Sequence, residues 1–560
     1  MPALMLVSVT NVYAEKPPNI LLIVADDLGY SDIQPFGAEI NTPNLQKLTD
    51  KGTVFTNFYS APTCSTTRSM LLTGNDHHQA GFGTMSEFIQ PEQKGKPGYE
   101  GYLNPRVISI AEILQQKGYY TFMSGKWHLG NNEHSNPNAR GFDEVFTLIT
   151  GGGGHFDDSS TFPVKTKTPT YFENGKPYTL PKDFFTSNYY TDKFLNYLKK
   201  ERKKDQPFFG YLAFTAPHWP LQAPDSDIKK YESFYKDGYE VIRKNRFDRM
   251  VKLGLIDKST KINNPLKDVL PDWEDLTKSQ KREQIKLMQI YAAMIDNMDQ
   301  NIGRVIKHLE ETGELDNTLI LFTSDNGSEA AIPESMGVAA LPKGIKEWVD
   351  STFDNSLENL GRIGSYATLG PQWAQVSSTP LPYFKGILAP GGVRVPTIVR
   401  YPKLTEAHKI NKDTVHVMDF VPTILDLLAI ETPKVRKNIP LIKMEGTSFL
   451  PVFKNQKIKR DAIGWEFNDG KALLKDEWFV RQQSYPFGTG QWQLYDLGKD
   501  PTMLNDLANK QPKKVSNLVT QWNNYAKRVG VISEPPRYTY GQAICFYGTC
   551  LEPENIKNIK

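Results

Sequence analysis

Cysteine is scarce in this sequence, with only three residues among 560. Cys545 and Cys550 stand close together in the segment AICFYGTC, and in an oxidising compartment they could close a small loop as a disulfide. Cys64 lies far from both in the chain and is left over by this count. A single cysteine in the segment APTCSTTRSMLLTG therefore needs another explanation.

The sequence also lacks an excess of charge of either sign. Its 66 Lys and Arg residues stand against 63 Asp and Glu residues, which gives a net charge of +3. Broad electrostatic binding of nucleic acid needs a concentrated basic surface. This balance therefore argues against a nucleic-acid partner.

Long hydrophobic runs are missing as well. After the N-terminus no stretch approaches the roughly 20 apolar residues of a membrane-spanning helix, so we expect no membrane span. Residues 3–9 are apolar and Val12-Tyr13-Ala14 resembles a signal-peptide cleavage site, although the usual positively charged start is absent. We predict that residues 1–16 are a signal-like or disordered segment and that the protein is periplasmic or secreted.

Apolar runs alternate with helical patterns along most of the chain. The runs have the composition of buried parallel strands and cover residues 19–25, 208–215, 318–323 and 396–401. The helical patterns cover residues 44–52, 108–118, 290–313 and 419–430. This alternation predicts an α/β fold with a large, mostly parallel sheet sandwiched by helices.

The pattern changes near residue 432. Short aromatic-rich strands followed by one helix indicate a smaller C-terminal α+β domain at residues 432–560. We predict that residues 17–431 form the main domain. Residues 222–285 are charged and weakly periodic, and we interpret them as an insertion on that domain.

Oxygen-rich doublets follow two of the predicted strands. Asp26 and Asp27 come directly after the first strand, and Asp325 and Asn326 come after the strand at 318–323. Open parallel sheets bind ligands at the carboxyl ends of their strands, where gathered carboxylates would repel one another unless a cation neutralises them. Hard oxygen ligands are typical of Ca²⁺ or Mg²⁺ rather than zinc. The same residue types are usual in turns and helix caps, so the pattern alone leaves both interpretations open.

Basic side chains are predicted at the same edge. The strand at 208–215 is followed by His218, and a fifth predicted strand and turn at 120–130 carries Lys126 and His128. Beside a cation, these residues suit a polyanionic substrate and its leaving group.

Cys64 precedes a helix that we expect to begin near residues 65–67, where hydroxyl side chains could cap it. A helix N-terminus attracts anions and lowers the pKa of a thiol, and Arg68 lies one turn along the same face. The local pattern indicates a nucleophile and would fit a cysteine-nucleophile phosphatase. A hard-oxygen metal site prefers an oxygen nucleophile, however, so we expect a group other than a thiol at position 64.

These segments together resemble the signature blocks of type I sulfatases, a family of the alkaline phosphatase superfamily, and most of all bacterial arylsulfatases. The segment CSTTRSMLLTG is similar to the signature that joins a cysteine or serine to an arginine four residues later. The other blocks are NILLIVADDLGYSD, GKWHLG, APHWPLQAP, FTSDNG, YFKG with GGVRVP, and WQLYDLGKDPTMLNDLA in the C-terminal domain. The resemblance covers about residues 17 to 530. It departs from the signature at Thr66, where the family has proline or sometimes alanine.

The resemblance implies hydrolysis of sulfate monoesters, with an aryl, carbohydrate or alkyl sulfate as substrate. A maturation enzyme would convert Cys64 to formylglycine, whose hydrate is an oxygen nucleophile, and Arg68 would belong to the modification signal. One Ca²⁺, or Mg²⁺ in its place, would be bound by Asp26, Asp27, Asp325 and Asn326, with residue 64 touching it.

The resemblance also implies roles for the basic residues. Arg68 and Lys126 would stabilise charge on the transferred group. Lys385 and His218 would contact the sulfate, and one of them would protonate the departing oxygen. His128 would take a proton from the second hydroxyl of residue 64 and so release the bound sulfate.

Two other functions fit parts of the pattern. A phosphonate or phosphate ester hydrolase of the same superfamily would bind a tetrahedral oxyanion of the same geometry. If Cys64 stays a thiol, the chain would be a non-catalytic sulfate-ester binding protein. We expect the pair His77-His78, the glycine loop at 151–154 and Tyr211 to be mainly structural.

Overall fold

A ten-stranded mixed sheet forms the centre of the protein in a computed structural model. The structure describes residues 16–157, 170–203, 205–267, 269–332, 345–468, 470–533, 544–547 and 549–550. The segment expected to be signal-like lies outside the described residues except for residue 16. Among the helices that are described, none is both long enough and apolar enough to cross a lipid bilayer.

The strand order is β11-β2-β10-β9-β1-β8-β4-β5-β6-β7. The strands are β1 (Asn19–Ala25), β2 (Gly52–Phe55), β4 (Tyr120–Lys126), β5 (Glu144–Leu148), β6 (Tyr171–Glu173), β7 (Lys176–Pro177), β8 (Phe208–Ala213), β9 (Thr318–Ser324), β10 (Thr397–Arg400) and β11 (Lys409–Asn411). The central strands β9, β1, β8, β4 and β5 are parallel to their neighbours in this group. The predicted α/β fold with a large, mostly parallel sheet is thereby confirmed.

One predicted strand runs in the other direction. The strand predicted at 396–401 exists as β10, but it pairs antiparallel with both β2 and β9, so a parallel orientation was wrong. The chain reaches β10 from Lys385, which lies beside Asp27 at the carboxyl end of β1. No crossover first returns the chain to the edge where the parallel strands begin. Strand β10 therefore starts at the edge where those strands end and runs antiparallel to β9.

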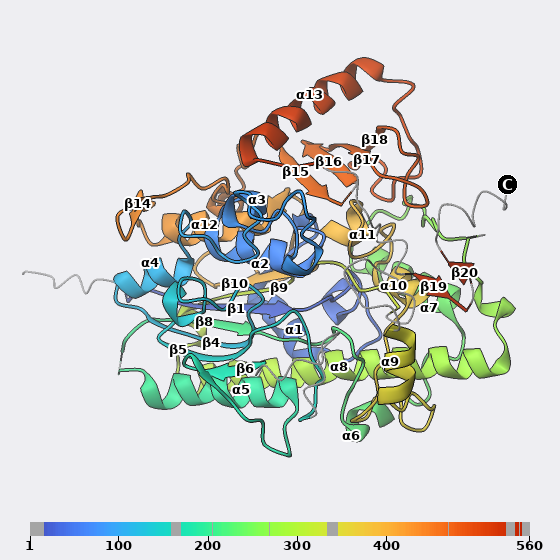
Figure 1. The fold of residues 1–560 in the computed structure, drawn as a ribbon, viewed down its shortest axis with the longest axis horizontal. Helices are drawn as coiled ribbons and strands as arrows, with labels where there is room; N and C mark the ends of the chain where they lie inside the picture. The colour runs from blue at the N-terminus through green and yellow to red at the C-terminus, as the bar shows by residue number, and fades with distance from the viewer. Residues whose placement is uncertain are drawn as a thin grey trace, which may run out of the picture.

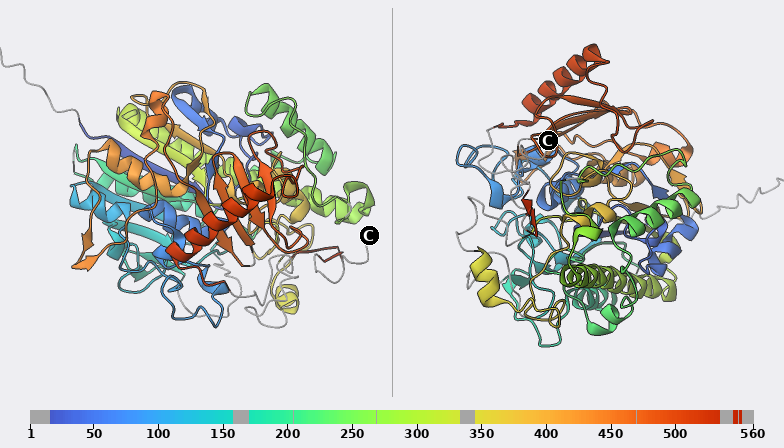
Figure 2. Two further views of the ribbon diagram at one scale, coloured as in Figure 1. Left: turned by 90° about the horizontal axis from the view of Figure 1, so that it is seen from above. Right: turned by 90° about the vertical axis from the view of Figure 1, so that its right-hand side faces the viewer.

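Helices cover both faces of the sheet (Figures 1 and 2). Side chains alternate along β1: Ile20 and Leu22 pack in the core with α2 (Cys64–Thr73), α4 (Ile110–Gln116) and α12 (Phe420–Leu427). Leu21 and Ile23 point to the other face, in the core with α5 (Thr186–Asn196) and α8 (Lys278–Glu311). A strand buried on both faces has no polar alternation, which is why β1 is apolar from Ile20 to Ala25.

Helix α8 is longer than the sequence pattern suggested. It begins at a capping box formed by Thr277 and Gln280 and continues for 34 residues, so it extends into the segment predicted as an insertion. Its N-terminal part is charged, which hides the helical period there. The same segment holds α6 (Asp225–Lys229) and α7 (Tyr239–Lys252).

A separate antiparallel sheet lies near the C-terminus. It consists of β15 (Ile463–Phe467), β16 (Gly470–Lys475), β17 (Trp478–Gln482) and β18 (Gln493–Asp496), and α13 (Pro512–Val529) packs on one face (Figure 1). The domain boundary at residue 432 stays a prediction. Further on, the backbone of β19 (Cys545–Phe546) pairs with that of β20 (Thr549–Cys550), with Cys545 opposite Cys550; their disulfide also stays a prediction.

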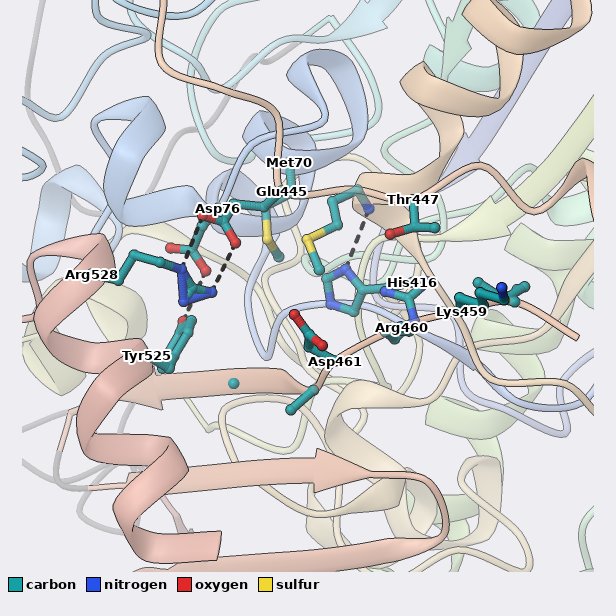
Figure 3. Close-up of a pocket in the computed structure, with 14 residues that line it drawn as sticks. Met70, Asp76, His416, Glu445, Thr447, Lys459, Arg460, Asp461, Tyr525 and Arg528 are labelled. Atoms are coloured by element: carbon teal, nitrogen blue, oxygen red, sulfur yellow. Dashed lines mark hydrogen bonds and ion pairs between the residues drawn. The ribbon is translucent and has the colours of Figure 1, made fainter.

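A buried ion cluster joins this small sheet to residues 76–78. His78, in α3 (His77–Ala80), lies between two carboxylates: its Nδ1 is 2.9 Å from Asp76 Oδ1 and its Nε2 is 3.3 Å from Glu466 Oε2 of β15. The Tyr525 hydroxyl of α13 donates to Asp76 Oδ2 at 2.8 Å. A cavity of about 470 Å³ adjoins Asp76 and Tyr525 (Figure 3).

The two histidines of this cluster differ in charge. Burial alone would lower the pKa of His78, but hydrogen bonds and charge from Asp76 and Glu466 raise it to about 9. For His77, burial and then the charge on His78 lower the pKa to about 4. His78 is therefore the protonated member, and its single positive charge partly offsets those of two buried carboxylates.

We predict that His78→Gln lowers the stability of the protein near neutral pH by on the order of 3 kcal/mol, because it leaves buried carboxylates without their cation. A folded-state pKa of about 9 lies above the unfolded value near 6.5, so the contribution is complete below pH 6.5 and is lost as the pH rises through 9. Thermal unfolding midpoints at pH 6 and pH 9.5 would measure this. A His134→Gln variant, which breaks an exposed His–Glu pair, is the control. Equal midpoints of wild type and His78→Gln at pH 6 would contradict the prediction.

Candidate active site

The two predicted carboxylate doublets meet at one edge of the sheet. Strands β1 and β9 are parallel neighbours with Ala25 opposite Ser324, so the residues that follow them lie side by side. The Asp27 amide donates to Asp325 Oδ1 at 3.2 Å, and Asp26, Asp27 and Asp325 are all buried. Asp27 has a φ of 62°, in the left-handed region that is uncommon for residues other than glycine, although aspartate and asparagine adopt it more often than most. Such a conformation at a cluster of charges is typical of a functional site.

Each of these carboxylates has its own buried cation. Lys126 Nζ, at the end of β4, lies 2.6 and 2.9 Å from the oxygens of Asp26. The Arg68 guanidinium lies 2.8 and 2.9 Å from Asp325 Oδ2. Lys385 Nζ lies 2.8 and 2.9 Å from the oxygens of Asp27. Burial favours the neutral form of Asp27, but the positive charges of Lys385 and Lys126 outweigh it and hold the pKa of Asp27 well below its usual range.

Cys64 lies in the middle of this charge cluster. It is the first residue of α2, and its thiol is 3.4 Å from Asp26 Oδ1 and 3.8 Å from Asp27 Oδ1. Burial raises the pKa of Cys64 well above 9, and the attraction of Lys126 and Lys385 does not offset it. The expectation that the helix terminus lowers the pKa of this thiol was wrong, because the loss of water on burial dominates and the neighbouring carboxylates Asp325 and Asp26 act in the same direction. Cys64 is a neutral thiol here, which speaks against a cysteine-nucleophile phosphatase.

The start of α2 also differs from the expectation. The helix begins at Cys64 rather than at residues 65–67, and its N-cap, Thr63, makes no side-chain cap hydrogen bond. The hydroxyl groups point backwards instead: Thr66 Oγ1 donates to the Thr63 carbonyl at 2.7 Å, and Thr67 Oγ1 accepts from the Ala61 amide at 2.9 Å. This turn holds Cys64 at the first helical position with Thr66 where the resemblance expects proline.

The two candidate histidines lie against one glycine loop. His218 Nε2 is 3.5 Å from Asp27 Oδ2, and its Nδ1 donates to the Trp219 carbonyl at 2.6 Å. A Cβ atom on Gly152 would lie 2.9 Å from the His218 ring, and one on Gly151 would lie 2.7 Å from the His128 ring. The loop is therefore glycine-rich because its backbone packs against both imidazoles. His128 is not paired with the carboxylate cluster; its side-chain hydrogen bond goes to Glu87 Oε1 at 3.1 Å.

Sequence reasoning missed two residues of the site. Glu329 is buried with Oε2 2.9 Å from Lys385 Nζ, and burial raises its pKa. It follows the second doublet by three residues, where no strand end marks it. Tyr211 was expected to be mainly structural, but its hydroxyl accepts a hydrogen bond from Arg68 Nη1 at 3.2 Å. Tyr211 lies on the face of β8 that packs against α2, and this position could have indicated a role in the site.

The donor atoms of the cluster suit a hard cation. Asp26, Asp27, Cys64 and His218 each offer a ligand atom, and these atoms lie within 4.8 Å of one another. Asn326 Nδ2 donates to Asp27 Oδ1 at 2.6 Å, while its buried Oδ1 has no hydrogen-bond partner among the described residues. A buried carbonyl oxygen without a partner is costly, and a cation would supply the missing contact.

The charge balance points the same way. Four buried carboxylates face three cations of the site, and His218 is neutral because burial lowers its pKa well below 6.5. Burial and the neighbouring Asp26 raise the pKa of Asp325 to about 6. This excess of negative charge fits the acidic cation site predicted from the sequence, although the ligand atoms that lie together also include one of His218, which the resemblance assigns to the substrate.

Comparison with known proteins gives a consistent family. The sequence profile described as Sulfatase matches residues 18–430, and one described as N-sulphoglucosamine sulphohydrolase, C-terminal, matches residues 383–527. An uncharacterized sulfatase of Schizosaccharomyces pombe is 42% identical over 540 residues, covering 94% of this chain and 96% of the relative. An arylsulfatase of Klebsiella aerogenes is 40% identical over 436 residues, covering 78% of this chain and 91% of the relative.

Solved structures share the fold. The crystal structure of Ps i-CgsB with a bound neocarrahexaose has a TM-score of 0.65 at 24% identity and covers 94% of this chain and 95% of that one. The phosphonate monoester hydrolase of Agrobacterium radiobacter has a TM-score of 0.54 at 18% identity and covers 92% and 96%. At these identities the likeness concerns the fold alone. The profile match and the relatives at 40% and 42% identity show that the chain belongs to the sulfatase family, whose members are sulfuric ester hydrolases with the alkaline phosphatase-like fold.

Proposed function

We propose that this enzyme is an arylsulfatase that uses residue 64 in its formylglycine form as the nucleophile. The observation that carries the proposal is the position of Cys64: it is buried between two carboxylates at the start of α2, where the loss of water raises the pKa of its thiol. A neutral thiol is a poor nucleophile. The hydrate of an aldehyde at this position would supply two hydroxyl groups, one to attack sulfur and one whose deprotonation releases sulfate.

We further propose a bound divalent cation, with Asp26, Asp27, Asp325 and Asn326 as its ligands and residue 64 beside it. When bound, Ca²⁺, or Mg²⁺ in its place, would polarise the sulfate oxygens and neutralise the carboxylates. The hard-oxygen donor set and the unpartnered Oδ1 of Asn326 support this assignment.

The cationic side chains provide the rest of the chemistry. Arg68 and Lys126 are fixed by buried ion pairs, so their charges are preorganised for the charge that develops on the transferred group. Lys385 and His218 both reach Asp27 and are placed to contact the sulfate, and one of them protonates the departing oxygen. His128 takes the proton from the second hydroxyl of residue 64.

An aryl sulfate is the substrate that the relatives favour, because the Klebsiella arylsulfatase is 40% identical. Structural neighbours include a protein in complex with D-glucosamine-2-N,6-O-disulfate, at 21% identity, so a saccharide sulfate is the second candidate. We also propose that a maturation enzyme modifies Cys64 and that the protein is periplasmic or secreted.

The state of residue 64 can be read by mass spectrometry of the tryptic peptide Gly52–Arg68 from protein made in its native host. We expect the mass of the aldehyde or its hydrate. Protein made without the maturation enzyme is the control and should carry an unmodified cysteine and no activity. An unmodified peptide from fully active protein would refute the proposed nucleophile.

Removal of divalent cations should lower both activity and thermal stability. A cation that binds only the folded state at a hundred times its dissociation constant stabilises by about 2.7 kcal/mol. We expect Ca²⁺ to raise the unfolding midpoint of chelator-treated protein, and Asn326→Ala to reduce this shift. An Asn359→Ala variant on the exposed surface is the control. An unchanged midpoint on adding Ca²⁺ and Mg²⁺ would contradict the cation site.

Rates on a matched aryl sulfate and aryl phosphate should differ in favour of the sulfate by at least tenfold in kcat/KM. The buried site already holds more carboxylates than fixed cations, and a phosphate monoester would add up to two negative charges where a sulfate adds one. A preference for the phosphate or for a phosphonate ester would instead support the second superfamily activity.

A further inference from the structure

The backbone conformation, the burial and the hydrogen bonding of His128 are all unusual for a histidine in a loop. Its φ is 57°, in the left-handed region that is strained for a histidine. Its side chain is buried, with 8% of its surface exposed. Its Nδ1 atom has no hydrogen-bond partner within the part of the chain that the structure describes. A strained, buried residue with an open ring nitrogen must be held in place by its neighbours.

Glu87 is the neighbour that holds the opposite side of the ring. It lies on the short 3₁₀ helix Ser86–Phe88, 41 residues before His128 in the chain. Its Oε1 is 3.1 Å from His128 Nε2. The Ser86 hydroxyl donates to the other oxygen, Oε2, at 3.0 Å. Gly151 packs closely against the same ring. The imidazole is therefore fixed between a carboxylate that is itself oriented and a glycine backbone.

This contact fixes which ring nitrogen carries the proton. An ionised carboxylate can only accept, so it selects the tautomer with the proton on Nε2. Nδ1 is then left with its lone pair, and it is the nitrogen without a partner.

We propose that Glu87 is a positioning residue that keeps His128 in the Nε2-protonated tautomer, with Nδ1 ready to accept a proton during release of sulfate. The proposal rests on the proposed function. In the step concerned, Nδ1 takes the proton of the remaining hydroxyl of residue 64 and the carbon–oxygen double bond forms. The bond from that carbon to the sulfate oxygen breaks, and sulfate leaves with the electron pair. Glu87 then faces an imidazolium at Nε2.

The chain offers a matched control pair. Glu133 Oε1 lies 3.1 Å from His134 Nε2, the same distance as in the proposed pair, but His134 is 63% exposed. An exposed pair of this kind is screened by water and contributes little. Replacing Glu133 therefore reproduces the loss of a Glu–His contact without affecting the site.

The first experiment reads the tautomer directly and does not need the modified enzyme. Protein with an unmodified Cys64 is labelled with ¹⁵N-histidine, and the ring signals of His128 are assigned by their loss in His128→Asn. At pH 8 we expect the wild type and Glu133→Ala to show a protonated Nε2 and a bare Nδ1. Glu87→Ala should show both tautomers. A protonated Nδ1 in the wild type, or unchanged signals in Glu87→Ala, would overturn the proposal.

The second experiment uses the modified enzyme with an aryl sulfate. We expect Glu87→Ala to lower kcat by roughly 10²-fold with KM changed less than twofold, and to accumulate the sulfated Gly52–Arg68 peptide. Glu87→Gln should recover part of kcat, because its amide oxygen still accepts from Nε2. Combining Glu87→Ala with His128→Ala should cost no more than His128→Ala alone, and additive losses would overturn the proposal.

The two hypotheses fail in different ways. A wild type with formylglycine at residue 64 but no hydrolysis of sulfate esters would refute the proposed function, and the tautomer experiment would still decide the role of Glu87. An active wild type with normal turnover in Glu87→Ala would refute the role of Glu87 alone. Equal thermal unfolding midpoints of Glu87→Ala and Glu133→Ala would show that the loss of activity in Glu87→Ala does not result from unfolding.

Discussion

Mutual neutralisation of buried charges at one sheet edge is the constraint on which the site depends. Asp26, Asp27 and Asp325 would repel one another without Lys126, Lys385 and Arg68, and each cation arrives from a different part of the chain. Removing one partner of a buried pair costs about 3–5 kcal/mol, because it leaves an uncompensated charge. The end of β4, the start of helix α2 and the segment before β10 are thus tied to the residues after β1 and β9 by charge as much as by packing.

The strand ends made much of this arrangement predictable. A short apolar run such as residues 20–25 favours a strand covered on both faces, and polar doublets after two such runs meet if the strands are parallel neighbours. This rule placed Asp26, Asp27, Asp325 and Asn326 correctly beside one another. It also brought Lys126 and His218 to the edge, because both follow central strands. Lys385 came from resemblance alone, since no strand precedes it.

What the sequence did not reveal depends on contacts between distant segments. The direction of β10 follows from where the preceding loop starts, and Glu329 and Glu87 are recognised only by the cations and imidazole they touch. The pKa of Cys64 was misjudged because a helix terminus is a local signal, whereas burial beside carboxylates is a property of the assembled site. Local patterns predict which elements form; the electrostatics of the site arise only when the elements pack.

The burial of Cys64 fixes an order of events. Its side chain is 2% exposed, and the helix that it starts is buried along its whole length. A modifying enzyme could not bind the residues around Cys64 in the folded protein unless α2 left the core. Any modification of this residue therefore has to happen while the segment is still an extended, unfolded chain, and the folding of the domain closes the opportunity permanently. Under the proposed mechanism, the time between synthesis and folding would therefore set the yield of active enzyme.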